Sequence, residues 1–176
     1  MITLICGTNR PGSNSARIAG FYAGRLNAAG VENQRLDLVD LPADMFQKNM
    51  YDGVAGDAWQ RIQEEVLIPA SHFVFVYPEY NGSFPGILKA MIDASDVRQC
   101  WHNKSACLVG VAAGRAGNLR GMEHFTNILN HLRINVLHLK IPISGVESVL
   151  NDQDEVTAPE TVKLIDEQIQ LFKSFA

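Results

Sequence analysis

ITLICGTNRPGSNSARIA, residues 2–19, contains the parts of a strand–loop–helix unit. Ile2–Cys6 is a short apolar run that ends at Gly7, which is typical of a strand buried on both faces. Beyond the polar residues that follow, apolar side chains recur at helical spacing at Ile18, Tyr22 and Leu26. Gly30 then provides a helix stop. This stretch therefore predicts a β-strand, a polar loop and an α-helix in that order.

The same alternation continues along the chain. Apolar runs predict strands at residues 34–38, 72–77, 106–112 and 134–141, most clearly at 72–77 (HFVFVY). Helical spacing predicts helices from residue 57 to near Pro69, from Pro85 onward, over 122–132 and over 162–172. Residues 40–56, rich in Pro, Asp, Asn and Gly, predict a long loop.

This order of elements predicts an α/β fold with a five-stranded parallel sheet and helices on both faces. We expect one domain over residues 1–176. Ligands of such sheets bind at the carboxyl ends of the strands, near the point where the strand order reverses. The loops to consider are therefore residues 7–13, 78–84 and 112–118.

Composition limits the possible partners. The net charge of −4 and the pI of about 5.7, without any basic stretch, argue against nucleic acid binding. No apolar run approaches the roughly 18 residues of a membrane helix. The N-terminus lacks the basic region and cleavage site of a signal peptide, so we expect a cytoplasmic protein that does not bind membranes.

The cysteine and histidine residues indicate neither a disulfide scaffold nor a metal site. The 3 cysteines show no C-x-x-C spacing, and Cys6 and Cys107 lie inside apolar runs, as small core residues do. The 5 histidines show no H-x-x-x-H spacing. We therefore predict no bound metal.

The first loop has the G-x-x-x-x-G spacing of a P-loop, but Ser13 stands where that motif requires lysine. The dinucleotide motif G-x-G-x-x-G fails as well, because residue 9 is Asn. Side chains that can donate hydrogen bonds to a phosphate are nevertheless abundant at this helix N-terminus: Thr8, Arg10, Ser13, Asn14 and Ser15. This chemistry suits one phosphate monoester. The alternative is a polar turn with Ser13 as the helix N-cap.

The other two loops are less decisive. In the second, Pro and Gly impose an irregular backbone, while Tyr80, Asn81 and Phe84 offer aromatic and amide groups. These groups would suit a planar heterocycle, but a tight turn with a buried Tyr explains them equally well. The third loop, AAGRAGN, allows close backbone approach, which could serve a ligand or packing.

Two motifs together resemble a known family. GTNRPGSNSARIA (residues 7–19) is similar to G-S-x-R-x-x-S of the NADPH-dependent FMN reductases. PEYNGSFPGILKAMIDASD (residues 78–96) is similar to their P-E-Y-N-x-x-x-P-G-x-L-K-N-A-I-D-W, with Ala90 and Ala94 as departures. Thr8 replaces Ser, and Ser15 stands where Asn is frequent. The resemblance implies a flavodoxin-like fold of strand order 2-1-3-4-5, bound FMN, and a homodimer or homotetramer.

The resemblance also implies the residues that bind FMN. Those matching the phosphate loop are Thr8, Arg10, Ser13, Asn14 and Ser15. Those matching the loop against the isoalloxazine ring are Pro78, Glu79, Tyr80, Asn81, Gly82 and Ser83. Those matching the third flavin loop, more loosely, are Gly114, Arg115, Gly117 and Asn118.

The function implied is that of an oxidoreductase. A hydride would pass from NADPH or NADH through FMN to a small acceptor such as a flavin, quinone, azo compound or metal oxyanion, with no catalytic side chain required. The alternative is a flavodoxin-like electron carrier, but such carriers tend to be strongly acidic and a net charge of −4 is mild. Four further roles stay open. Arg115 could favour the negative charge of the reduced flavin, meet an NADPH phosphate or simply be exposed. Trp59 and Trp101 could line the cleft or the core, and the pair Lys89 and Asp93 could serve an oligomer contact or only the surface.

Overall fold

A computed structural model describes residues 1–43, 45 and 56–175 of the chain. All strand pairings are parallel, and the path through the sheet is β2-β1-β3-β4-β5, with β6 also paired to β4. The strands are β1 (Ile2–Cys6), β2 (Asn33–Asp37), β3 (His72–Pro78), β4 (Ser105–Val111), β5 (Asn135–Val136) and β6 (Ile141–Ile143). The predicted parallel sheet and its strand order are confirmed.

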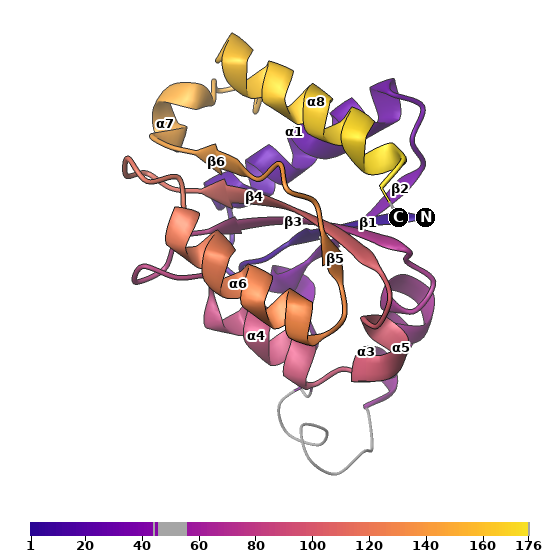
Figure 1. The fold of residues 1–176 in the computed structure, drawn as a ribbon. Coiled ribbons are helices and arrows are strands. Elements are labelled where there is room, and N and C mark those ends of the chain that lie inside the picture. The colour runs from indigo at the N-terminus through magenta and orange to yellow at the C-terminus, as the bar shows by residue number, and fades with distance from the viewer. Residues whose placement is uncertain (44, 46–55, 176) are drawn as a thin grey trace.

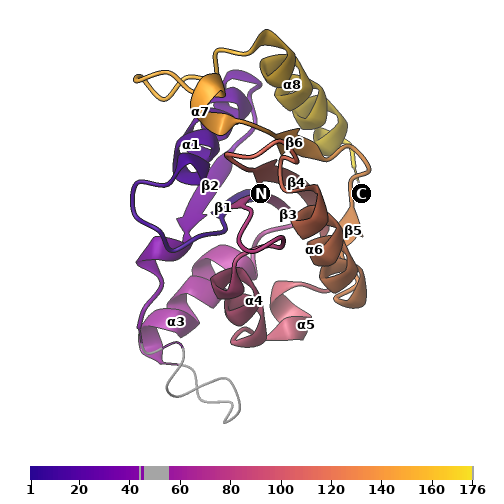
Figure 2. The ribbon, with the colours of Figure 1, turned by 90° about the vertical axis from the view of Figure 1, so that its left-hand side faces the viewer.

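Helices cover both faces of the sheet (Figure 1). One face carries α1 (Asn14–Ala28) and α8 (Pro159–Lys173). The opposite face carries α3 (Asp57–Ile62), α4 (Gly86–Asp93), α5 (Val97–Cys100) and α6 (Leu119–His131). Figure 2 shows the same layers from the side on which the loops of the site lie, with α7 (Val146–Val149) beside α1.

Alternation along the strands divides the core in two. In β3, Phe73 and Phe75 point to the layer of α4 and α6, while Val74 and Val76 point to the layer of α1 and α8. Every residue of β1 and β4 is buried, because helices cover both faces. The interior strands therefore read as continuous apolar runs in the sequence.

The predicted strand 134–141 is wrong in its extent, because the segment forms two short strands. β5 pairs Val136 with Ala106, and β6 pairs Ile141 with Val109, so β4 advances 3 residues while this segment advances 5. The buried side chain of Gln168 fills the gap. Its Nε2 donates to the carbonyl oxygens of Leu108 at 3.2 Å and Leu139 at 2.7 Å. An amide from α8 thus replaces part of the broken ladder.

Other differences from the sequence prediction are smaller. The predicted helix from residue 57 continues as a π-helical segment, Gln63–Leu67, and Pro85 is the N-cap of α4 rather than its first residue. The short helices α5 and α7 were not predicted. Of the predicted loop 40–56, residues 44 and 46–55 lie outside the described residues, whereas Leu38–Asp40 forms a 3₁₀ turn.

No helix among the described residues has both the length and the apolar character needed to cross a membrane. In the same part of the chain, no three His, Cys, Asp or Glu side chains gather as a candidate metal site.

Candidate FMN-binding site

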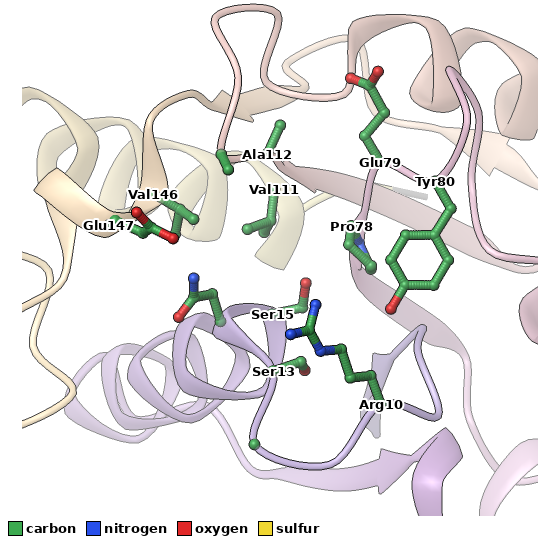
Figure 3. A pocket seen from close by; sticks show the side chains of 13 residues that line it. Arg10, Ser13, Ser15, Pro78, Glu79, Tyr80, Val111, Ala112, Val146 and Glu147 are labelled. Carbon is green, nitrogen blue, oxygen red and sulfur yellow. The ribbon is translucent and has the colours of Figure 1, made fainter.

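A cavity of about 300 Å³ lies at the carboxyl edge of the sheet, where α1 begins (Figure 3). Loops that follow β1, β3, β4 and β6 meet there. The residues that line it are Arg10, Gly12, Ser13, Asn14, Ser15, Pro78, Glu79, Tyr80, Val111, Ala112, Ala113, Val146 and Glu147. Its position is the one that a parallel doubly wound sheet reserves for ligands.

The loop after β1 is shaped by close packing and by a helix cap. Gly7 passes so near Tyr77 that a Cβ would lie 2.8 Å from the Tyr77 Cβ, and Gly12 turns the chain with φ +63°. Ser13 then caps α1, accepting a hydrogen bond from the Ala16 N–H at 3.1 Å. The first backbone N–H groups of α1 have no acceptor within the helix, and they begin at the wall of the cavity.

Ser15 gives this wall an unused donor. Its side chain is almost fully buried, yet its Oγ has no hydrogen-bond partner among the described residues. A buried hydroxyl left unpaired costs free energy, so such a group in a cavity wall indicates a missing partner. The phosphate oxygens of FMN would supply an acceptor there, and the donors present fit that group.

Thr8 connects two loops instead of lining the cavity. Its Oγ1 shares a 2.9 Å hydrogen bond with the Tyr80 hydroxyl and accepts from the Arg10 backbone N–H at 3.2 Å. The loop after β1 and the loop after β3 are therefore held in one arrangement, which places Arg10 at the cavity. The Arg10 guanidinium extends over the cavity toward Ser13 and Ser15 (Figure 3).

The loop after β3 divides into a wall and a turn. Pro78, Glu79 and Tyr80 line the cavity. Tyr80 and Ser83 exchange backbone hydrogen bonds at 2.8 and 3.0 Å around Asn81 and Gly82, whose φ values are +52° and +76°. The structure does not place Asn81, Gly82 or Ser83 in the cavity wall, and the Ser83 hydroxyl lies 2.9 Å from Nδ1 of His124 on α6.

In the loop after β4 the cavity is lined by Ala112 and Ala113, not by the four predicted residues Gly114, Arg115, Gly117 and Asn118. Gly117 is required by packing, because its φ is +54° and a Cβ would lie 2.6 Å from the Cβ of Pro142. Asn118 is fully buried and donates from Nδ2 to the Tyr77 carbonyl at 3.2 Å. Both residues therefore shape the loop from behind the cavity.

Val146 and Glu147 of α7 complete the wall, and the sequence prediction missed them. The Val146 N–H donates to the Ala112 carbonyl and the Gly145 N–H to the Gly114 carbonyl, both at 3.1 Å. The available signal was topological, because the loop after the last strand ends at the same edge as the other three. Glu147 and Glu79 add two acidic residues to the wall of the cavity, over which the Arg10 guanidinium extends.

Several polar or reactive side chains belong to the core and not to the site. Trp59 and Trp101 are fully buried, and their indole N–H groups donate to the Ala94 carbonyl at 2.7 Å and the Ser95 hydroxyl at 2.6 Å. Burial raises the pKa of each cysteine, Cys6, Cys100 and Cys107, to about 12. Cys6 and Cys107 are thus core residues, as predicted.

Lys89 and Asp93 form a 2.6 Å ion pair one helical turn apart on α4, with about 40% of each side chain exposed (43% and 40%). An exposed pair of this kind stabilises a helix only slightly. Within the single chain it therefore has the geometry of an ordinary surface pair.

A doubly wound sheet with hydroxyl and amide donors around a cavity at a helix N-terminus defines a flavodoxin-like protein. Comparison with known proteins agrees. The chain is similar to the flavoenzyme NAD(P)H:acceptor oxidoreductase FerB of Paracoccus denitrificans, with a TM-score of 0.76, 20% identity and coverage of 97% of this chain and 93% of the other. At that identity the likeness shows the fold alone.

Sequence comparison identifies the family. The model of the NADPH-dependent FMN reductases matches residues 1–145. An NAD(P)H-dependent FMN reductase of Pseudomonas aeruginosa is 29% identical over 94% of this chain and 89% of its own length. A quinone reductase of Pseudomonas putida is 26% identical over 88% of this chain and 83% of its own. The chain belongs to the NADPH-dependent FMN reductase family.

Family membership makes the protein an NAD(P)H-dependent oxidoreductase with FMN as its cofactor. It confirms the resemblance seen in the two motifs, and it favours the enzyme over the electron carrier.

Proposed function

We propose that this chain is a single-domain cytoplasmic reductase that holds FMN in the cavity at the start of α1 and passes electrons to small acceptors, quinones among them. The unpaired, buried Ser15 hydroxyl in the cavity wall carries the assignment of the phosphate end. The curated relatives of the chain include several quinone reductases, which favours quinones as acceptors. The active form is a homodimer or homotetramer, as the resemblance implies.

When bound, FMN supplies the redox chemistry, accepting a hydride from NAD(P)H and returning two electrons to the acceptor. The side chains of this chain bind and orient it. Ser13, Asn14, Ser15 and Arg10 donate hydrogen bonds to the phosphate, and the α1 dipole favours its charge. Pro78, Glu79 and Tyr80 on one side and Ala112 and Ala113 on the other form the walls for the rest of the cofactor.

The proposed residues farther from the cavity act through the loop backbones. Thr8 holds Tyr80 in place, while Asn81, Gly82 and Ser83 form the turn that carries the Pro78–Tyr80 wall. Gly117 and Asn118 set the path of the loop that carries Ala112 and Ala113, and the Gly114 carbonyl ties that loop to the Gly145 N–H. Arg115 is exposed on the same loop. All of them remain in the proposed site as positioning residues.

The test is anaerobic reduction of the FMN-loaded protein by NADPH and, separately, by NADH. We expect rapid bleaching of the flavin absorbance, followed by its return when a benzoquinone is added. Bound FMN that neither nicotinamide reduces would contradict the reductase and leave an electron carrier. Light scattering of the eluting protein checks the oligomeric state, and a monomeric active species would contradict the proposed assembly.

A further inference from the structure

Arg17 lies one helical turn into α1 and is held by a loop far along the chain. Its Nη1 donates to Oδ1 of Asn14 at 3.2 Å. Its Nε forms an ion pair with the Asp154 carboxylate, and its Nη2 donates to the Asn151 carbonyl. The guanidinium thus joins a residue of the cavity wall, Asn14, to the loop that follows α7.

The contact with Arg17 decides which end of the Asn14 amide is free. A guanidinium can only donate, so it must face the amide oxygen. The other end, Nδ2, is a donor, and among the described residues it makes no hydrogen bond. A cavity-lining Asn whose oxygen is already engaged can offer its N–H groups to a bound anion.

The loop that holds Arg17 is itself ordered by local hydrogen bonds. The Asn151 Oδ1 accepts from the N–H groups of Gln153 at 3.0 Å and Glu155 at 2.9 Å. Asp154 has φ +62°, a left-handed conformation that a non-glycine residue adopts at some cost. This turn brings the Asp154 carboxylate to Nε of Arg17, while Nη1 of the same guanidinium faces the Asn14 amide.

We propose that Arg17 is a positioning residue for the phosphate end of the site, acting through Asn14: Asp154 orients Arg17, Arg17 engages the Asn14 oxygen, and the Asn14 amide N–H groups then donate to the phosphate. The inference rests on the proposed FMN site. It makes residues 151–155, which do not line the cavity, a determinant of phosphate affinity.

A different mechanism would also make Arg17→Met weaken FMN binding, because a positive charge near a phosphate is favourable at any orientation. The two mechanisms differ at Asp154. If Arg17 acts by charge alone, Asp154→Asn removes a neutralising carboxylate and FMN binds more tightly. If Arg17 acts through its orientation, the same substitution releases the guanidinium and FMN binds more weakly.

The experiment measures the affinities of wild type and variants for FMN and for riboflavin, which lacks the phosphate, by quenching of flavin fluorescence. We expect Arg17→Met to weaken FMN binding about tenfold, the effect of one oriented hydrogen bond to a charged group, and to leave riboflavin binding unchanged. Asp154→Asn should also weaken FMN binding. Arg17→Lys keeps the charge but not the planar fork, and so it also loses affinity.

Arg25→Met is the matched control. Arg25 also lies on α1 and pairs with Asp166 of α8 at 2.8 and 2.6 Å, away from the cavity. Its loss destabilises the contact between these helices without changing the ratio of FMN to riboflavin affinity. Asn14→Ala combined with Arg17→Met should cost no more than Asn14→Ala alone, because both act on one contact.

Three outcomes would overturn the inference: tighter FMN binding by Asp154→Asn, equal losses for FMN and riboflavin in Arg17→Met, or additive losses in the double variant. A wild-type protein that binds FMN no better than riboflavin would instead refute the proposed phosphate site. A wild-type protein that prefers FMN, with Arg17→Met unchanged, refutes only the role of Arg17.

Discussion

Arg10 is the guanidinium that lines the cavity, and among the described residues its side chain makes no hydrogen bond. A charge-assisted hydrogen bond to phosphate contributes about 1.5–3 kcal/mol. We expect Arg10→Ala to weaken FMN binding about 10- to 100-fold, and Arg10→Lys to weaken it less. Calorimetric titration with FMN and riboflavin checks this. An unchanged FMN affinity, or an equal loss for riboflavin, would show that Arg10 does not meet the phosphate.

Replacing Glu147 should change FMN affinity in the opposite direction to replacing Arg10. Glu147 lines the same cavity as Ser13, Asn14 and Ser15, the proposed hydrogen-bond donors to the phosphate. A carboxylate there repels a dianionic ligand. We expect Glu147→Gln to tighten FMN binding about three- to tenfold at low salt, and the gain to shrink as salt screens the carboxylate. Stopped-flow measurement of FMN release at two salt concentrations tests the prediction. Glu160→Gln, on the exposed first turn of α8, is the charge-matched control and should not change release. Weaker FMN binding in Glu147→Gln would mean that the carboxylate accepts a hydrogen bond from the ligand.

At the scale of single elements, α5 is a short helix whose stability depends on its cap. The Asp96 Oδ1 accepts from the N–H groups of Arg98 at 3.0 Å and Gln99 at 2.9 Å, and Oδ2 accepts from the Gln99 side chain at 2.8 Å. These hydrogen bonds, those of Gln99 first, hold the pKa of Asp96 below its usual value. Loss of such a cap costs about 1 kcal/mol, so Asp96→Ala should lower the free energy of unfolding by about that amount at neutral pH.

The pH dependence of that loss follows from the direction of the shift. Because the pKa of Asp96 is lower in the folded state, its stabilisation is complete above the usual carboxyl pKa and disappears as pH falls through the folded value. Urea unfolding of wild type and Asp96→Ala should therefore give curves that converge in acid. If the free energies of unfolding of wild type and Asp96→Ala differ by the same amount down to low pH, the charged carboxylate is not what caps α5.

One pair of elements, β5 and β6, shows where a sequence pattern fails to predict the bounds of a strand. Residues 134–141 alternate apolar and polar except at the doublet Val136–Leu137, and this one irregularity did not lead the sequence analysis to separate β5 from β6. The break is compensated by the buried amide of Gln168, which comes from a helix about thirty residues farther along the chain. A pattern within the strand cannot report a hydrogen-bond partner on another element, whereas β1, in which every residue is buried, was predicted to the residue.

At the scale of the whole molecule, strand order determines which loops can meet, so the sequence predicted that the loop after β1 would lie at the ligand-binding edge of the sheet, where it lines the cavity. Ser13, Asn14 and Ser15 lie where helix capping and donor chemistry predicted. Glu147 was missed because only three of the converging loops were considered. Asn118 carries the right chemistry for a ligand, but close packing against Gly110 and Gly121 keeps it behind the cavity wall. Composition shows which groups a loop contains, and packing decides which of them face a ligand.

The same convergence of four loops predicts that FMN stabilises the entire fold. A ligand bound only to the folded state adds about 2.7 kcal/mol when its concentration is 100 times its Kd, and for a chain of this size that raises Tm by about 5–10 °C. Thermal unfolding of the cofactor-free protein with added FMN should show this rise, with less in Arg10→Ala and more in Glu147→Gln at equal FMN concentration. Riboflavin at that concentration should raise Tm much less, because the phosphate contacts at α1 contribute a large part of the affinity. Equal stabilisation by the two flavins would place the phosphate outside the cavity, even if the protein still binds FMN.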